Sequence, residues 1–212
     1  DVYKRQVLIC QMEAHINPKE IKDCADMGIT SFALEQVPRI SRAQSMDVLS
    51  SQSNLAGYRA VIEASQIYRK AFPMMMTAAG TIPPARVLVM GAGVAGLQAI
   101  ATAKRMGAIV SATDVRPASK EQVESLGGKF VAVEDDEFKE AESSGGYAKQ
   151  MSAAYQKKQA ELVAKTITDQ DIVITTALIP GKPAPKLISD AMVKSMKPVS
   201  YTHLRAHETL LD

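Results

Sequence analysis

Short apolar runs alternate along the chain with longer stretches in which apolar positions recur at helical spacing. Residues 86–90 (RVLVM) form a nearly continuous apolar run, which is typical of a strand buried on both faces of a parallel sheet. The pattern predicts strands at residues 7–10, 29–34, 86–90, 109–113, 130–133 and 171–175, and helices at residues 18–27, 56–73, 97–106, 120–126 and 147–166. We therefore expect an α/β protein with a doubly wound parallel sheet.

Two regions of the chain follow this alternation, and a polar stretch separates them. Residues 35–54 are polar and serine-rich, and a connection of that length is usually functional or disordered. A helix with a stripe of small residues follows, and small residues let such a helix pack closely on its neighbours. Thr81–Pro84 marks a boundary. We predict a partial N-terminal α/β domain at residues 7–55, a linking helix at 56–80 and a second α/β domain at 81–198.

The two terminal peptides do not fit the pattern. Residues 1–6 (DVYKRQ) and 199–212 (VSYTHLRAHETLLD) resemble translated sequencing-adapter read-through. We expect both peptides to be non-native, and we assign no function to His203 or His207.

Composition argues against several classes of protein. Hydrophobic residues make up 46% of the chain and charged residues 23%, as in ordinary globular proteins. The net charge is +2 with the basic residues dispersed, so nucleic acid is not an expected partner. No apolar run approaches the roughly 18 residues that span a bilayer, and no signal peptide opens the chain. Cys10 and Cys24 lack disulfide-framework or metal-site spacing, which favours a cytoplasmic protein with free thiols.

The strongest chemical signal is the glycine loop Gly91–Ala92–Gly93–Val94–Ala95–Gly96, which follows a predicted strand and opens a predicted helix. In a Rossmann-type domain Gly91 would make the tight turn, Gly93 would let the backbone approach a pyrophosphate, and Gly96 would let the helix pack on the sheet. Asp114 ends the next strand, as the dinucleotide-binding fingerprint requires. We predict an NAD(H) site here, the alternative being an incidental glycine turn.

Asp114 is the predicted determinant of cofactor choice. A carboxylate there accepts hydrogen bonds from the ribose hydroxyls and repels a 2′-phosphate, which favours NAD over NADP. Arg116 complicates this prediction because an arginine nearby can accept that phosphate. The structural alternative is that Asp114 caps the following helix.

Three further segments carry candidate residues, each with a purely structural alternative. Residues 39–50 could hold a nicotinamide carboxamide or form a solvated loop. Tyr147 could belong to a lid over the cofactor or start a helix on the surface. Residues 175–185 leave the last predicted strand at its carboxyl end, where ligands bind in open sheets, or form a stiff connection. His15 has no evident acid or metal partner and is interpreted as structural.

Together these segments resemble the NAD(H)-binding alpha subunit (domain I) of proton-translocating NAD(P) transhydrogenase, within the alanine dehydrogenase/transhydrogenase superfamily. The resemblance covers residues 7–198. It rests on PRISRAQSMDVLSSQSNLAGYRAV (38–61), MMTAAGTIPPARVLVMGAGVAGLQAIATAKRMGA (75–108), ATDVRP (112–117), GGYAK (145–149) and TTALIPGKPAPKLI (175–188). The resemblance implies two Rossmann-like domains, with a portion of the first and the later strands of the second absent from this chain.

The resemblance also implies roles for individual residues. Arg39, Gln44 and Asp47 match the catalytic loop that positions the nicotinamide ring, and Tyr147 matches the tyrosine that folds over bound nucleotide. The cofactor-binding residues would be Ser50, Gly91, Gly93, Val94, Ala95, Gly96, Asp114, Val115, Arg116, Tyr147, Thr176, Ala177 and Leu178, with no metal ligands.

The implied activity is hydride transfer from NADH bound here to NADP⁺ on a partner NADP-binding domain, coupled to proton translocation by a membrane domain. Such a transfer needs positioning of two nicotinamides and no side-chain acid or base. The resemblance implies a homodimer, peripheral to the cytoplasmic side of the inner membrane. The alternatives are an alanine dehydrogenase, against which the RISRAQSMD loop argues because that chemistry needs a lysine and a histidine near C4, and an inactive NAD-binding fragment.

Overall fold

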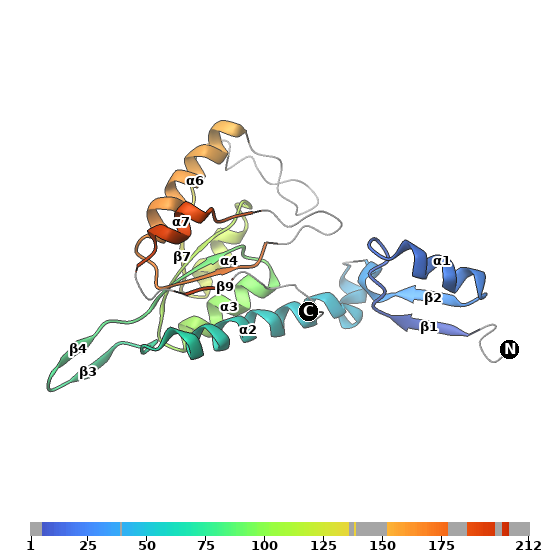
Figure 1. Ribbon diagram of the computed structural model, residues 1–212, viewed down its shortest axis with the longest axis horizontal. Helices are drawn as coiled ribbons and strands as arrows, with labels where there is room; N and C mark the ends of the chain where they lie inside the picture. The colour runs from blue at the N-terminus through green and yellow to red at the C-terminus, as the bar shows by residue number, and fades with distance from the viewer. Residues whose placement is uncertain are drawn as a thin grey trace. The chain divides into compact units, whose positions relative to one another are not determined.

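The computed structural model describes residues 6–38, 40–135, 138, 152–177, 186–197 and 201–203. Only the backbone of residues 201–203 is described. These residues form two compact units. Described residues up to Gln52 belong to unit 1, and described residues from Ser53 onward belong to unit 2. Figure 1 labels the helices and strands of both units.

Unit 1 is built around two parallel strands joined by a helix (Figure 1). β1 (Val7–Cys10) pairs with β2 (Thr30–Ala33), and the 3-10 helix η1 (Leu34–Gln36) follows β2. α1 (Pro18–Asp26) begins with a proline, whose missing N–H would have no partner within the helix at that position. Gly28, with φ of +70°, turns the chain from α1 into β2. The predicted strand–helix–strand order is confirmed in this unit.

The stretch expected to be a long polar loop is largely helical. It contains the 3-10 helix η2 (Ser41–Met46) and the first turns of α2 (Val48–Tyr68). Asp47 accounts for the start of α2, because its carboxylate oxygens accept hydrogen bonds from the Ser50 backbone N–H at 2.9 Å and from the Ser50 hydroxyl at 2.6 Å. An aspartate in this position satisfies N–H groups that the first turn leaves unpaired. The expected loop at residues 35–54 is therefore wrong over most of its length.

Unit 2 contains a parallel sheet in the order β7-β6-β5-β8-β9. Neighbouring strands pair in parallel throughout. β5 is central, and the chain adds strands first on one side of it and then on the other. The strands are β5 (Arg86–Met90), β6 (Ile109–Thr113), β7 (Lys129–Phe130), β8 (Ile172–Thr175) and β9 (Tyr201–His203). This order confirms the predicted doubly wound sheet.

Alternate residues of β5 face two different cores. Val87 and Val89 pack in a cluster with residues of α2, α3 (Val94–Arg105) and α4 (Ser119–Ser125). Leu88 and Met90 pack with residues of α6 (Ala153–Ile167) and residues flanking α7 (Asp190–Ser195). Figure 1 shows α2 and α3 on one side of the sheet and α6 and α7 on the other. Helices on both faces explain why this strand is apolar without alternation.

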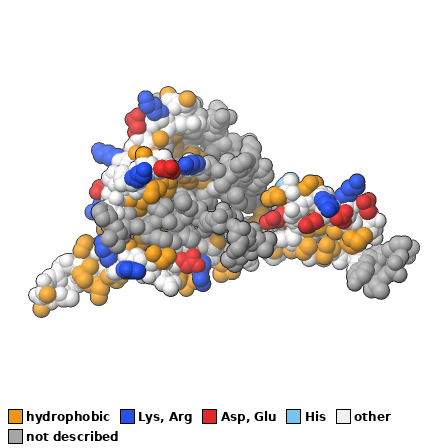
Figure 2. All heavy atoms as spheres, in the orientation of Figure 1, with side chains coloured by type: hydrophobic (Ala, Val, Ile, Leu, Met, Phe, Trp, Pro, Cys, Tyr) orange, Lys and Arg blue, Asp and Glu red, His pale blue; other side chains and the backbone are white. Residues whose placement is uncertain are grey.

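A β-hairpin that the sequence did not predict precedes the sheet. β3 (Met75–Thr77) and β4 (Gly80–Ile82) pair antiparallel, at the place interpreted as a boundary. The hairpin extends away from the sheet of unit 2 (Figure 1). Its apolar side chains are exposed (Figure 2), with Met76 at 75% and Ile82 at 46%. The hairpin escaped prediction because neither strand alternates apolar with polar residues toward a core.

Other elements differ from the expectation at their ends. β7 is shorter than the predicted strand at 130–133, and the first residues of the helix predicted at 147–166 lie outside the described residues. α7 and β9 were not predicted. β9 belongs to the terminal peptide that we expected to be non-native, and its backbone pairs with β8. Among the described residues, no helix has the length and apolar character needed to cross a membrane.

Candidate functional site

The glycine loop lies at the point where the sheet changes its direction of winding. It follows the carboxyl end of β5, between the ends of β6 and β8. Gly91 has φ of +105°, and its N–H donates to the Thr113 carbonyl at 2.8 Å. The Thr176 hydroxyl donates to the Gly91 carbonyl at 2.8 Å. Ligands of open α/β sheets bind outside this edge, at the switch point.

The three glycines of the loop meet different surroundings. A Cβ on Gly91 would lie 2.7 Å from the Thr176 hydroxyl oxygen, and a Cβ on Gly96 would lie 1.8 Å from the Gly91 carbonyl oxygen. A Cβ on Gly93 would meet no atom of the described residues within 4 Å. Gly91 and Gly96 are therefore required by the packing of the protein itself, whereas Gly93 borders open space.

The open space at Gly93 lies at the amino end of α3. Gly93 is the N-cap residue of that helix, and no side chain among the described residues caps it. Val94 is 42% exposed, while Ala95 is buried. The N–H groups of a helix's first turn and the positive end of its dipole suit a diphosphate, so the residues present fit the predicted dinucleotide.

Helix α2 packs against the first turn of α3, where the glycine loop ends. A Cβ on Gly57 would lie 2.0 Å from the Ala95 carbonyl oxygen, so the α2 backbone lies directly against the first turn of α3. The stripe of small residues predicted this kind of close packing. It did not identify the start of α3 as the partner.

Asp114 follows β6, and its side chain is only 7% exposed. One oxygen accepts hydrogen bonds from the Ala92 N–H at 2.7 Å and from Arg116 Nη2 at 3.0 Å. The other accepts from the Arg116 N–H at 2.9 Å and from Arg116 Nε at 3.0 Å. Burial raises the pKa of Asp114, but the hydrogen bonds from Arg116 and Ala92 outweigh burial and hold it below its usual 3.8. The alternative that Asp114 caps the next helix is wrong, because the N-cap of α4 is Ala118.

The end of β8 completes this edge of the sheet. The Thr176 N–H donates to the Met90 carbonyl at 2.8 Å, so Thr176 ties β8 to the glycine loop through both its backbone and its hydroxyl. Ala177 follows at the same edge, and Val115, beyond β6, is 48% exposed. Leu178 and most of the predicted stiff connection lie outside the described residues.

Gln159 is a residue of this region that sequence reasoning missed. Its amide nitrogen donates to the Thr113 hydroxyl oxygen at 2.9 Å, and its amide oxygen accepts from the Val133 N–H at 2.9 Å. Gln159 thus links α6 to the end of β6, next to Asp114. The bond to Thr113 spans 46 positions, so no local motif could have indicated it.

Unit 1 holds the residues predicted to position the nicotinamide. The side chain of Gln44 is exposed in η2, whereas Asp47 and Ser50 are partly buried and bonded to each other as the cap of α2. His15 hydrogen bonds to Gln36 at 2.8 Å, which supports its structural interpretation. Arg39 and Tyr147 lie outside the described residues.

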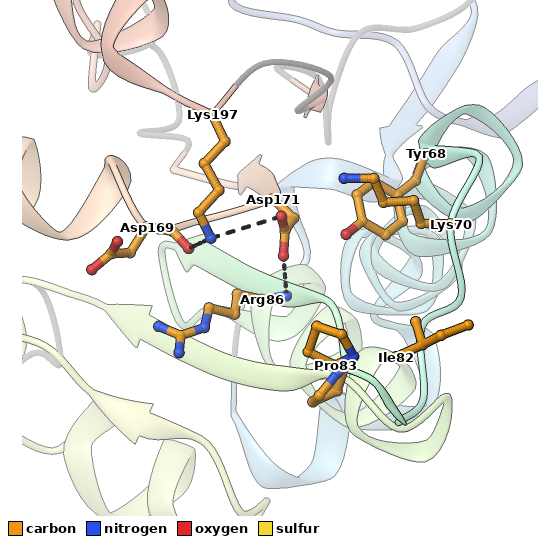
Figure 3. Close-up of a pocket in the computed structure, with 9 residues that line it drawn as sticks. Tyr68, Lys70, Ile82, Pro83, Arg86, Asp169, Asp171 and Lys197 are labelled. Carbon is orange, nitrogen blue, oxygen red and sulfur yellow. Dashed lines mark hydrogen bonds and ion pairs between the residues drawn. The ribbon is translucent and has the colours of Figure 1, made fainter. Parts of the chain in front are cut away.

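A cavity of about 510 Å³ lies at the opposite edge of the unit 2 sheet (Figure 3). Arg86, at the start of β5, and Asp171, just before β8, are among the residues that line it. Asp171 accepts the Arg86 N–H at 2.9 Å and lies 3.9 Å from Lys197 Nζ. Burial, together with Asp171, raises the pKa of Tyr68 to about 12. We interpret this network as structural, because it fastens the amino ends of the strands, away from the glycine loop.

Two family models match most of the chain. The family model described as "Alanine dehydrogenase/PNT, N-terminal domain" matches residues 1–56, and "Alanine dehydrogenase/PNT, C-terminal domain" matches residues 60–201. The junction between the two matches falls within α2.

The chain is similar to individual transhydrogenases and, less closely, to an alanine dehydrogenase. The first portion of the NAD(P) transhydrogenase alpha subunit of Rhodospirillum rubrum is 64% identical over 194 residues, which are 92% of this chain and 50% of the relative. A solved transhydrogenase from Sinorhizobium meliloti is 60% identical, has a TM-score of 0.83 and is matched over 92% of this chain and 52% of that one. Alanine dehydrogenase of Mycobacterium tuberculosis is 31% identical over 182 residues, 82% of this chain and 41% of the relative. The chain spans about half the length of the Rhodospirillum rubrum transhydrogenase relative and of its Rickettsia prowazekii counterpart.

Proposed function

Because the chain belongs to the alanine dehydrogenase/PNT family, we propose that it is the NAD(H)-binding portion of an NAD(P) transhydrogenase alpha subunit. The diphosphate of NAD(H) binds at Gly93 and the first turn of α3, and Asp114 accepts hydrogen bonds from the hydroxyls of the adenine ribose. Val94, Ala95, Val115, Thr176, Ala177 and Leu178 complete the contacts.

The observation that carries this proposal is the contrast among the loop glycines. Gly91 and Gly96 have close protein neighbours, but the side of Gly93 where a Cβ would stand is open. Open space beside a helix end that no described side chain caps is what a bound diphosphate requires. A glycine turn without ligand would need no such space.

The whole protein's activity belongs to the proposal. Bound NADH supplies a hydride to NADP⁺ held on a partner NADP-binding domain, and a membrane domain couples the transfer to proton translocation. Arg39, Gln44, Asp47 and Ser50 orient the nicotinamide ring, and Tyr147 covers the bound nucleotide and excludes water. These residues hold and shield the reacting carbon, because hydride transfer between two nicotinamides needs neither a general acid nor a general base. The chain acts within a homodimer on the cytoplasmic side of the inner membrane.

The nucleotide site is tested by filling the open space. Gly93 has φ of −75° and ψ of −169°, a conformation that other residues adopt, so Gly93→Val should leave the fold intact. We expect NADH, followed by its fluorescence in a titration, to bind the variant roughly tenfold or more weakly, a loss of about 1.4 kcal/mol or more. An unchanged thermal midpoint serves as the control for folding. Equal NADH affinity in the two proteins would rule the site out.

The role of unit 1 is tested with the parent-length protein and its partner. Gln44→Ala should slow hydride transfer by roughly 100-fold, since small misplacements of a reacting carbon carry costs of that order. The NADH dissociation constant should change much less. Gln52→Ala, an exposed substitution on α2, is the matched control. Equal losses in transfer rate and affinity would contradict a positioning role for Gln44.

Alanine dehydrogenase is the second candidate function, since the Mycobacterium tuberculosis enzyme matches most of the chain at 31% identity. The same parent-length protein distinguishes the two activities. We expect reduction of an NADP⁺ analogue by NADH, and no NADH oxidation on addition of pyruvate and ammonia. The opposite result would assign the alanine dehydrogenase reaction.

A further inference from the structure

Every acceptor position of the Asp114 carboxylate is occupied within the protein. An ionised carboxylate has about four lone-pair sites on its two oxygens. Asp114 receives four hydrogen bonds at 2.7–3.0 Å, two from backbone N–H groups and two from the Arg116 guanidinium. A ribose hydroxyl can bond to this carboxylate only if one of the present donors leaves.

The four donors differ in their freedom to move. The Ala92 N–H belongs to the glycine loop, whose backbone is anchored by bonds at Gly91, and the Arg116 N–H is part of the chain directly after Asp114. The Arg116 guanidinium stands at the end of a long side chain that is 35% exposed. The guanidinium is therefore the donor that can be displaced, because a partly exposed side chain can rotate toward water whereas the two N–H groups are fixed in the backbone.

We propose that Arg116 competes with the nucleotide for Asp114: its guanidinium takes the place of the ribose hydroxyls in the free protein and swings away when NAD(H) binds. The inference rests on the proposed function, in which Asp114 accepts those hydroxyls. Arg116 is thus a specificity-determining residue that weakens the binding of the unphosphorylated nucleotide.

The displaced guanidinium remains tethered beside the ribose. A 2′-phosphate placed there would be repelled by Asp114 but could pair with the guanidinium in a bidentate manner. Arg116 therefore acts in opposite directions on the two kinds of nucleotide. It lowers the affinity for an adenine ribose with a free 2′-hydroxyl and raises the affinity for one that carries a 2′-phosphate.

The test compares Arg116→Ala with wild type, using ADP-ribose and 2′-phospho-ADP-ribose as probes in calorimetric titrations. Both probes lack the nicotinamide, so the titrations do not depend on the nicotinamide-positioning residues of unit 1. We expect Arg116→Ala to bind ADP-ribose roughly threefold to tenfold more tightly, and 2′-phospho-ADP-ribose more weakly by a similar factor. Arg105→Ala removes the same charge from the far end of α3 and should change neither affinity. Arg116→Met, which keeps an apolar stem without donors, replaces Arg116→Ala if that variant does not fold.

The outcomes separate the inference from the proposed function. If wild-type protein binds ADP-ribose and Arg116→Ala binds it equally or more weakly, the nucleotide site stands and the competition is wrong. If wild-type protein does not bind ADP-ribose, both are wrong. If Arg116→Ala changed the affinities for both probes in the same direction, the inference would also be overturned. Arg116 would then affect both nucleotides alike and would not distinguish them by the 2′-phosphate.

Discussion

The two units share a strand–helix–strand order but bury their strands very differently. In unit 2, Val87, Leu88 and Val89 of β5 are completely buried. In unit 1, Val7 and Ile9 of β1 are 61% and 62% exposed, and α1 has no buried residue. The local pattern of a strand and a helix therefore specifies the element, while burial depends on the layers that cover it.

The largest expected effect tests that contrast directly. Leu88→Ala removes a side chain packed between β5 and α6 and should lower the free energy of unfolding by about 2–5 kcal/mol. Ile9→Ala, the matched change on the exposed β1, should alter it by less than about 0.5 kcal/mol. Urea unfolding followed by circular dichroism measures both. Comparable losses in the two variants would mean that β1 is buried in solution.

The next effect sharpens the comparison within the glycine loop of unit 2. Gly96→Ala forces a Cβ against the Gly91 carbonyl oxygen and should cost about 1–3 kcal/mol of stability, because neither backbone can easily move. Gly93→Ala should cost less than about 0.5 kcal/mol, since its Cβ points into open space. Thermal unfolding of the pair is the measurement. The prediction fails if Gly93→Ala is the less stable variant.

A smaller effect concerns the start of α2 in unit 1. Asp47→Ala removes the acceptor for the Ser50 N–H and should cost about 1 kcal/mol of stability. Asp47→Asn keeps an acceptor and should cost only a few tenths of a kcal/mol. If Asp47→Asn nevertheless slows hydride transfer in the parent protein, the charge serves the nicotinamide as well as the helix. Equal stability of the two variants in thermal unfolding would remove the capping role.

The smallest effect compares one carboxylate from each unit under acid. Glu35 accepts hydrogen bonds from the Met12 and Ala14 N–H groups, and although burial raises its pKa, these bonds hold the pKa below its usual 4.5. Asp114 likewise has a lowered pKa. Both groups therefore stabilise the fold at pH values above their ordinary pKa values. This stability is lost as the pH falls through their lowered pKa values. Unfolding free energies measured from about pH 6 to pH 3 should decline less in Glu35→Gln and in Asp114→Asn than in wild type. The same decline in all three would show that neither carboxylate is responsible.

The sheet and the glycine loop could be predicted because their signals are local. The uninterrupted run at 86–90, the three glycines and Asp114 each report on a neighbouring stretch of backbone, and the comparisons confirm the predicted family. Thr176 was correctly placed at the strand end. The use of its hydroxyl to bind Gly91 depends on tertiary structure and could not be predicted.

Other features could not be predicted for stated physical reasons. Asp47 was predicted only as a functional residue, because the serine-rich composition around it hid the signal for a helix start. Gln159 was missed because its partner on β6 is distant in sequence. The hairpin of β3 and β4 has neither a core-facing pattern nor a strong turn sequence at Ala78–Ala79.

The hydrogen bond from Thr176 to Gly91 also affects the order of events during folding. Its two ends are separated by 85 positions, so it can form only after the chain has closed a long loop and β8 has docked beside β5. A ribosome must therefore synthesise the chain well past the glycine motif before this edge of the sheet can be fastened. The competence to hold a dinucleotide should appear late, together with cooperative completion of the sheet.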